Sequence, residues 1–236
     1  MTSSVLIERA SRPQRRERRK HERPGEILEA ALELFVDKGY AATRIEEVAS
    51  RAGVSKGTVF LYFPSKLELF KEVVRCNISN RLEEWAGHFA QFEGSSADLL
   101  RMTMLLWWER IGSTKASGIS KLMMSEGQNF PEMAAFFHQA VIRPGHRILR
   151  RVIEHGIARG EFRKLPVDHA VQGVISVMVF LALSRHCIAW SNDEFMSIEP
   201  MHYLDEQARL IARGLASDQD SPASLERPWL ATGGAA

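Results

Sequence analysis

The stretch from Thr43 to Lys66, TRIEEVASRAGVSKGTVFLYFPSK, constrains the fold of this chain most, because it marks two helix starts in a short space. Thr43 is followed three residues later by Glu46, and Ser65 three residues later by Glu68. This is the capping-box spacing, in which a hydroxyl and a carboxylate satisfy unpaired backbone amides at a helix start. We therefore expect one helix to begin at Thr43 and another at Ser65.

The middle of this stretch has the residues of a helix end followed by a new start. Gly53 can adopt the left-handed conformation that ends a helix, and Ser55 can cap the next helix. Apolar residues of the first helix fall on one face, and apolar residues of the second can close over them. The two sets are Ile45, Val48 and Ala49, and then Val54, Val59 and Phe63. The pattern predicts a helix-turn-helix with Gly53 as its hinge.

The residues left exposed on the second helix suit DNA. They are a basic residue, a glycine that allows close backbone approach, a hydroxyl and two aromatic rings: Lys56, Gly57, Thr58, Phe60 and Tyr62. Such groups contact phosphates, base edges and thymine methyls in the major groove. A helical hairpin with a polar solvent face is the alternative interpretation of the same residues.

The run from Gly39 to Phe70, above all GVSKGTVFLYFPSKLELF, resembles the DNA-binding domain of the TetR family of bacterial repressors, and the similarity extends back to Pro24. The resemblance implies a three-helix domain whose helix from about Ser55 to Tyr62 enters the major groove. It also implies which residues contact DNA. Thr43, Tyr62 and Lys66 would contact phosphate, Ser55, Lys56, Gly57 and Thr58 would form the groove-facing turn, and Arg44 is a further DNA-binding candidate.

Phe60 departs from the family pattern, which usually has tyrosine at this position. Without the hydroxyl, Phe60 cannot donate a hydrogen bond to phosphate. We therefore expect a methyl or packing contact from Phe60 instead.

The charge distribution places the DNA-binding end at the N-terminus. The net charge is only +2, but residues 1–71 hold 14 Lys and Arg against 10 Asp and Glu, whereas the rest of the chain holds 17 against 19. Residues 1–23 are predicted to form a basic flexible arm, which either follows the DNA backbone or minor groove or is a solvated tail with generic nucleic-acid affinity. No apolar segment follows the arginines, so no signal peptide is expected.

Length and composition fit two domains. A chain of 236 residues with 45% hydrophobic content can hold a small module and a larger one. We expect an all-α fold, with a three-helix DNA-binding domain at residues 24–70 and a larger helical ligand-binding and dimerisation domain at 71–217. The tail, residues 218–236, is polar and rich in Pro, Gly and Ala, and is expected to be disordered.

Helical periodicity continues through the body without an alternating strand pattern. The first helix is expected to begin at Pro24 and end at Gly39. The helix capped by Ser65 is expected to continue to about Gly87, and in the family such a helix joins the two domains.

The last two helices are candidates for dimerisation. Residues 173–183 form an uninterrupted apolar or small run, shorter than the ~20 residues that cross a bilayer. The core or a second subunit must cover such a run. The family resemblance implies that this helix and the final one, which begins at Pro200, pair with their symmetry mates. The resulting homodimer suits a palindromic operator, and no membrane partner is expected.

Flexible and aromatic side chains concentrate in the central helices. Methionine and tryptophan line adaptable apolar pockets. The alternative interpretation is that these residues belong to the core of a helical domain. The resemblance implies a pocket for an apolar or cationic small molecule. The residues proposed for its wall are Met104, Trp107, Trp108, Met123 and Phe137.

No metal or cofactor is expected, because no two histidines of the body have the His-x-x-x-His spacing of a helical metal site. Cys76 and Cys187 lie far apart and outside any Cys-x-x-Cys pattern, consistent with a reducing cytoplasm.

Three functions of different class are open. The first is a ligand-responsive transcriptional repressor that a hydrophobic small molecule releases from a palindromic operator. The second is a sequence-specific or architectural DNA-binding protein without such an effector. The third is an enzyme, but the chain has no Gly-x-Ser-x-Gly, phosphate loop, dinucleotide fingerprint or zinc motif, so we do not expect catalysis.

Overall fold

The computed structural model describes residues 11–88, 92–187 and 198–217, which are almost entirely helical. In the described residues the sole β-type pairing is an isolated bridge between Phe162 and Ala216, so the all-α prediction is confirmed. The α-helices are α1 (Ser11–Lys38), α2 (Ile45–Arg51), α3 (Lys56–Tyr62), α4 (Lys66–Val74), α5 (Asn80–His88), α6 (Ser96–Trp107), α7 (Gly118–Glu126), α8 (Pro131–Phe137), α9 (Arg143–Ala158), α10 (Val167–Cys187) and α11 (Pro200–Leu215).

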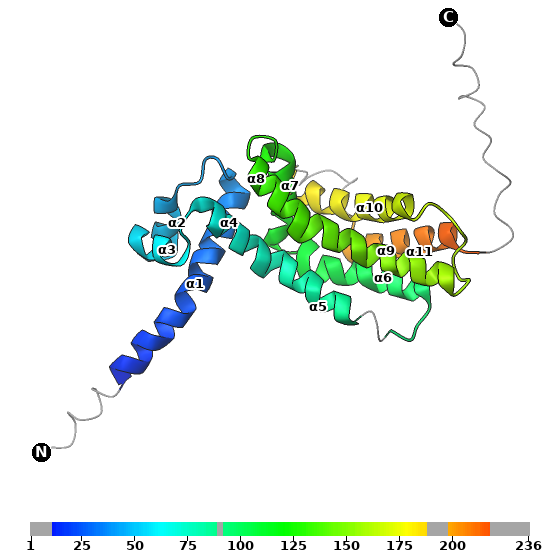
Figure 1. Cartoon of the computed structure of the whole chain (residues 1–236), viewed down its shortest axis with the longest axis horizontal. Coiled ribbons are helices and arrows are strands. Elements are labelled where there is room, and N and C mark those ends of the chain that lie inside the picture. Colours follow the sequence, from blue (N-terminus) through cyan, green and yellow to red (C-terminus); the bar gives the residue numbers. More distant parts are fainter. Residues whose placement is uncertain (1–10, 89–91, 188–197, 218–236) are drawn as a thin grey trace, which may run out of the picture.

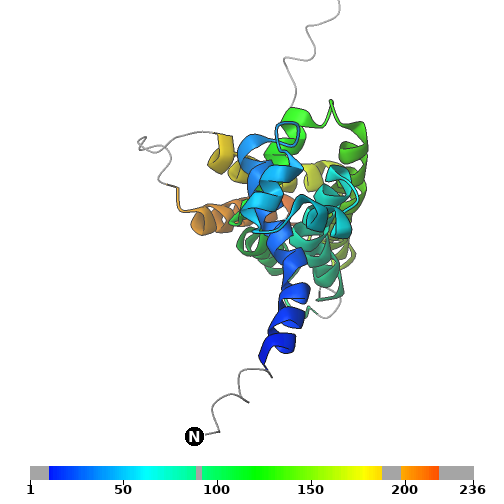
Figure 2. The same cartoon turned by 90° about the vertical axis from the view of Figure 1, so that its left-hand side faces the viewer.

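The molecule has a small N-terminal part around α2 and α3, packed on α1 and α4, and a larger helical body (Figure 1). We call the small part the reading end. Helices α2 and α3 form one end, and α6, α9, α10 and α11 lie along the body. The N-terminal half of α1 projects away from both parts, as the view turned by 90° also shows (Figure 2). The reading helix α3 therefore lies at an outer end of the molecule, where DNA can reach it.

The structure has two hydrophobic clusters, one that joins the two parts and one within the body. One contains the core of α1–α4, including Phe35 and Phe70, and continues without a break into the body through Ile119, Met133 and Phe137. The other joins α6, α9, α10 and α11. The expected domain boundary after residue 70 thus falls inside α4, and the reading end shares its core with α7 and α8.

Helix α1 begins earlier than the sequence indicated. It starts at Ser11 and not at Pro24, which lies inside the helix. Residues 11–23 are rich in Arg, Glu, Gln and Lys, which have high helix propensity. A proline inside a helix removes one main-chain hydrogen bond, and here that loss does not end the helix. The first ten residues of the expected arm lie outside the described part of the chain.

The caps of the helix-turn-helix agree with prediction except at its start. The hydroxyls of Ser55 and Ser65 accept the N–H of Thr58 and Glu68, as expected, and Gly53 has a φ of +64°. Helix α2, however, is capped at Arg44 and not at Thr43. The prediction of a cap at Thr43 was wrong by one residue, because the Thr43 hydroxyl turns inward to the end of α1.

The helix from Ser65 spans the predicted residues but changes its hydrogen-bond pattern. A π-helical turn, η1 (Arg75–Ser79), links α4 to α5, which ends at His88. Similar turns follow α6, as η3 (Trp108–Gly112), and α8, as η5 (His138–Ile142). Between η3 and α7 lies a short 3-10 turn, η4 (Lys115–Ser117).

The last two helices leave apolar side chains uncovered. Phe180 on α10 is 63% exposed and Leu210 on α11 is 57% exposed. A 20-residue window of α10, Val167–His186, has a mean hydropathy of 1.6, yet only 28% of it is buried. By length and composition alone α10 can therefore cross a bilayer, which the shorter run considered in the sequence did not reveal. The tail at 218–236 lies outside the described residues.

The hinge glycine generates a prediction about stability. Gly53→Ala should lower the free energy of unfolding by about 1 kcal/mol, because a Cβ is unfavourable at positive φ. Gly25→Ala is the matched control, since a Cβ at either glycine meets no atom within 4 Å but Gly25 lies in helix α1. Gly25→Ala should raise the free energy of unfolding by about 0.5–1 kcal/mol. Urea denaturation of both variants measures this, and a shift of the same sign in both would contradict it.

Candidate DNA-reading surface and ligand pocket

The first turn of α3 presents polar groups in a fixed arrangement. The Ser55 hydroxyl caps the helix by accepting the Thr58 N–H at 3.1 Å, and the two hydroxyl oxygens lie 2.9 Å apart. Ser55, Lys56 and Gly57 are exposed, and Thr58 is half-buried. The structure therefore brings the four residues of the predicted groove-facing turn together at one surface.

Lys56 is held in place from both sides. Its Nζ lies 2.6 Å from Glu46 Oε1 on α2, and also lies over the Phe60 ring at 5.7 Å from the centroid. The hydrogen bond from Lys56 lowers the pKa of the Glu46 carboxyl. Both side chains are exposed, so this ion pair contributes little stability and a phosphate can compete for Lys56.

The outer face of α3 also carries an apolar residue that sequence analysis missed. Leu61 is 77% exposed and Phe60 is 41% exposed, whereas Val59 and Phe63 are buried. The signal was available in the sequence, because Leu61 lies off the Val59–Phe63 stripe. Such side chains suit thymine methyls. The other predicted contacts, Arg44 and Tyr62, are exposed and half-buried respectively.

Two predicted phosphate contacts have structural partners instead. Thr43 is 1% exposed, and its hydroxyl donates to the carbonyls of Gly39 at 2.6 Å and Leu34 at 3.2 Å. Its hydroxyl is therefore not available to a phosphate in this structure. Thr43 occupies the position at which the family pattern implies a phosphate contact. Because its side chain is buried, its hydroxyl bonds main-chain carbonyls of the protein.

Lys66 holds the turn between α1 and α2. Its Nζ donates to the carbonyls of Tyr40 at 2.7 Å, Thr43 at 3.0 Å and Ala41 at 3.3 Å. The ammonium also lies 4.5 Å from the centroid of the Tyr40 ring. Burial lowers the pKa of Lys66, and the negative charge of Glu126 opposes that shift. Lys66 thus has three protein acceptors where a contact with phosphate was expected.

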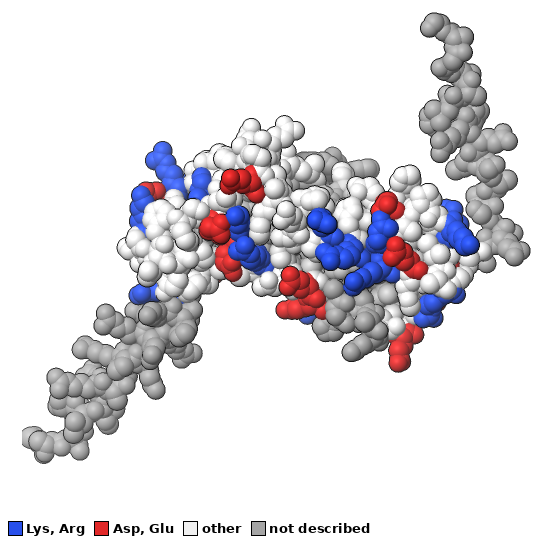
Figure 3. All heavy atoms as spheres, in the orientation of Figure 1, with Lys and Arg blue, Asp and Glu red and all other residues white. Residues whose placement is uncertain are grey.

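Charge on the visible face is mixed. Lys and Arg lie both at the end that carries α2 and α3 and over α9, interspersed with Asp and Glu (Figure 3). Among the predicted DNA contacts, the exposed basic residues are Lys56 and Arg44.

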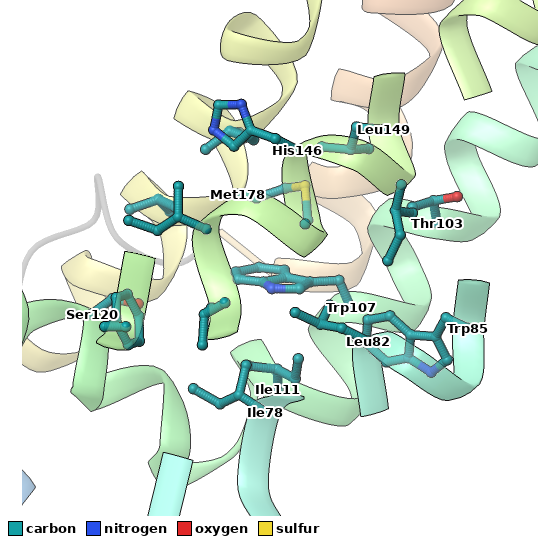
Figure 4. A pocket seen from close by; sticks show the side chains of 17 residues that line it. Ile78, Leu82, Trp85, Thr103, Trp107, Ile111, Ser120, His146, Leu149 and Met178 are labelled. Carbon is teal, nitrogen blue, oxygen red and sulfur yellow. The ribbon is translucent and has the colours of Figure 1, made fainter. Parts of the chain in front are cut away.

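An apolar cavity of about 150 Å³, partly open to solvent, lies in the body (Figure 4). Its wall consists of Ile78, Leu82, Trp85, Thr103, Trp107, Ile111, Ser120, Phe137, Val141, Ile142, Gly145, His146, Ile148, Leu149, Ile175, Met178 and Val179. In Figure 4 the Trp107 ring crosses the middle of this wall, with Ser120 and His146 on different sides of it.

Two of the five predicted wall residues, Trp107 and Phe137, line this cavity. Met104 and Trp108 instead lie in the core between α6, α9 and α10, and Met123 packs against the other cluster. Residue type indicated the right region, but which face of a helix meets the cavity depends on packing. The aliphatic residues of α9 and α10 on this wall were missed because they resemble any other core residues.

The cavity favours an uncharged occupant. Among its lining residues there is no Asp, Glu, Lys or Arg, and the polar ones are Thr103, Ser120 and His146. The Thr103 hydroxyl already donates to the Leu99 carbonyl at 2.7 Å. Burial, then the nearby charges of His138 and Arg150, lower the pKa of His146. A neutral imidazole offers one donor and one acceptor but no counter-ion, so this wall offers a cationic ligand, one of the two kinds expected, only aromatic rings such as those of Trp85 and Trp107, and no carboxylate.

Each of the three π-helical turns contributes to the cavity wall. Ile78 belongs to η1, Ile111 to η3, and Val141 to η5. Such turns interrupt regular helical hydrogen bonding and are frequent at functional sites. Within the described residues no group of three His, Cys, Asp or Glu side chains is placed to hold a metal ion.

Family models match both parts of the chain. Residues 27–73 match the model described as bacterial regulatory proteins, tetR family. Residues 93–190 match the model described as tetracyclin repressor-like, C-terminal domain. The first match covers the helix-turn-helix, and the second covers most of the cavity.

Individual proteins show the same similarity. The HTH-type transcriptional activator FasR of Mycolicibacterium smegmatis is 49% identical over 59 residues, 25% of this chain and 27% of FasR. The regulator SrpR of Pseudomonas putida is 25% identical over 196 residues, 81% of either chain. Among solved structures, FadR of Bacillus subtilis in complex with stearoyl-CoA superposes with a TM-score of 0.63 at 16% identity, over 80% of this chain and 98% of FadR. The last match supports the fold.

The environment of Lys66 generates a second prediction. Lys66→Met should lower the free energy of unfolding by about 1.5–3 kcal/mol, because three carbonyls lose a charged donor. It should leave the salt dependence of DNA binding unchanged. Lys56→Met is the control, since loss of an exposed phosphate contact should reduce the slope of log K against log salt by about 0.9 with little effect on stability. A reduced slope for Lys66→Met would restore it as a phosphate contact.

Proposed function

Because this chain belongs to the TetR family of bacterial transcriptional regulators, we propose that it is a repressor that a hydrophobic small molecule releases from a palindromic operator. The observation that supports this most is the exposed first turn of α3, where Ser55, Lys56, Gly57 and Thr58 form one surface. A helix presented in this way at the end of a molecule fits a major groove.

The proposed DNA contacts follow from exposure. Lys56 and Arg44 contact phosphate or base edges, and Thr58 reads a base edge from the turn. Phe60 and Leu61 contact thymine methyls, since both are exposed and apolar. Tyr62 contacts phosphate, as the family resemblance implies.

Two residues support the reading surface from beneath. Thr43 closes the end of α1, and Lys66 holds the carbonyls of the next turn. Both keep α2 and α3 in position without touching DNA themselves.

The proposed effector is uncharged in the part that the protein buries. A cavity of about 150 Å³ accommodates a molecule the size of benzene, so a longer ligand must either extend through the open side of the cavity or displace its wall. FadR, solved with stearoyl-CoA, shows that this fold can bind an acyl thioester in one relative. The π-helical turns are the places where this wall can rearrange.

FasR is named as a transcriptional activator. For this chain we propose repression instead. Release by ligand requires only that ligand and operator favour different conformations. Activation requires a further contact with the transcription machinery. The second candidate function, DNA binding without an effector, differs in its response to small molecules and is tested below. We propose no catalytic role, in line with a family of regulators.

The proposed functional unit is a homodimer in the cytoplasm, formed through α10 and α11. Phe180 and Leu210 are exposed there, and Met201 at the start of α11 is 38% exposed. A membrane can also cover an apolar helix, but Glu199, Asp205 and Arg209 belong to the same region and favour a protein partner. Two reading helices on such a dimer would face DNA about 34–36 Å apart.

Selection from random duplex DNA at about 0.15 M salt tests the proposal. We expect an enriched palindrome whose half-sites lie about 10 base pairs apart, centre to centre. Binding without enrichment, which merely weakens as salt rises, would favour the architectural alternative.

Phe180→Glu is the matching dimerisation variant. It places a charge on the exposed α10 surface, so the protein should sediment as a monomer and no longer enrich a palindrome. Met124→Glu is the control, because Met124 is 71% exposed but lies on α7. Loss of the dimer in both variants, or in neither, would contradict the proposed interface.

A ligand screen by thermal unfolding tests the proposed effector. An uncharged compound such as indole or 1-octanol should raise the melting temperature, and at a concentration of 100 Kd the stabilisation is about 2.7 kcal/mol, or roughly 5–10 °C. Stearoyl-CoA tests the acyl class, with free coenzyme A as its control. A cationic dye should give a smaller shift, because the wall has no acidic residue. Silence across all uncharged and acyl compounds would favour the effector-free alternative.

A further inference from the structure

Glu126, the last residue of α7, reaches out of the body to the reading end. Its Oε1 accepts the N–H of Tyr40 at 3.1 Å, and its Oε2 accepts the N–H of Ala41 at 2.8 Å. These amides belong to the turn between α1 and α2. An ionised acceptor makes stronger hydrogen bonds than a neutral one, so this is a specific attachment between the two parts of the molecule.

The turn is shaped to receive this carboxylate. Gly39 has a φ of +91°, and a Cβ there would collide with Glu126 Oε1. On the other side of the same backbone, Lys66 takes the carbonyls of Tyr40 and Ala41. The body thus binds the amides of the turn, while the reading end binds its carbonyls.

A second contact from the body lies beside the first. The rings of Tyr40 and Phe130 are 4.8 Å apart, edge to face, and Phe130 immediately precedes α8. Tyr40 is buried and also packs against Phe35 and Phe70. The C-terminal end of α7 and the N-terminal end of α8 therefore both contact this turn.

Both helices also reach the cavity. Ser120 lines it from α7, and Phe137 lines it from α8. Ser120 and Glu126 are six residues apart, which is about 9 Å along a helix. Each helix of this hairpin, residues 118–137, thus has one end at the cavity and the other at the turn that leads into α2.

We propose that the α7–α8 hairpin transmits the state of the cavity to the reading helix, with Glu126 as the positioning residue that connects them. This deepens the proposed function, on which it rests. An occupant that pushes Ser120 and Phe137 apart displaces the hairpin, and Glu126 carries the turn with it. Because α2 follows the turn directly, α3 then changes its position relative to its symmetry mate.

The cavity can be filled without knowing the effector. Gly145 lines the wall, and a Cβ added to it meets no atom within 4 Å. Gly145→Leu therefore adds a permanent apolar side chain at the wall of the cavity, and its Cβ meets no other atom within 4 Å. In the otherwise wild-type protein it should change the operator Kd by at least about fivefold, within the usual range of coupling between sites.

Variants of Glu126 decide whether the hairpin carries this effect. Glu126→Gln keeps one acceptor oxygen for the two amides, and Glu126→Ala keeps none. The effect of Gly145→Leu on operator Kd should fall to less than about twofold in the Ala background, with an intermediate value in the Gln background. Glu132→Gln is the matched control, because it removes an exposed carboxylate from the same hairpin. It should leave the effect intact.

Hydrogen exchange at Tyr40 and Ala41 tests the connection without any operator. Glu126→Ala should speed exchange of both amides by about tenfold, and Gly145→Leu should change it in the same two residues. An effect of Gly145→Leu that persists in full in the Ala background, or no effect on either operator Kd or these amides, would overturn the proposal. If the wild-type protein selects no operator, the proposed function is wrong. Amide exchange at Tyr40 and Ala41 then still tests whether Glu126 connects the cavity to the turn.

Discussion

The reading end shares its hydrophobic core with the body, and this constraint shapes the rest of the molecule. Helices α1–α3 are few and short apart from α1, and small domains bury too little apolar surface to be stable alone. Phe35, Tyr40 and Phe70 therefore pack into a cluster that continues to Met133 and Phe137 in the body. Because the core is shared, a change in the body cannot leave the reading end untouched. This shared core provides a physical route for the regulation by a ligand that we propose.

Backbone polar groups at the junction impose a second requirement. The turn between α1 and α2 has amides and carbonyls that are part-buried at Tyr40 and Thr43 and exposed at Ala41, and an unpaired group costs about 1–3 kcal/mol only where water is excluded. Glu126 and Lys66 meet this need from opposite sides. Long charged side chains can bond these groups from farther away than backbone groups can. At this turn the body and the reading end are therefore connected by side chains. Such a joint can shift as a unit while its hydrogen bonds remain made.

The sequence predicted what local chemistry decides. Ser55 and Ser65 are caps because the residues three positions on supply the amides, and Gly53 ends α2 because its backbone requires positive φ. It did not predict the partners of Lys66 or Glu126, which are 26 and 86 residues away in the chain at Tyr40. Thr43 and Leu61 show the same limit. Only the packed fold buries the first and leaves the second exposed, although both lie in the stretch that resembles the family most strongly.

The exposed apolar surface of α10 and α11 is the proposed dimer interface. Dimerisation there would make the proposed displacement of the reading helix matter for operator affinity. A single reading end that tilts by a few degrees would lose little affinity, because one helix can settle again in the groove. In a dimer joined through Phe180 and Leu210 the two reading helices are tied at a fixed distance, and DNA repeats only every turn. A small displacement at Tyr40 and Ala41 then appears twice, with opposite sense on the two half-sites. The operator can match one spacing of the helices and not the other, so a shift too small to unfold any element is enough to separate the two states.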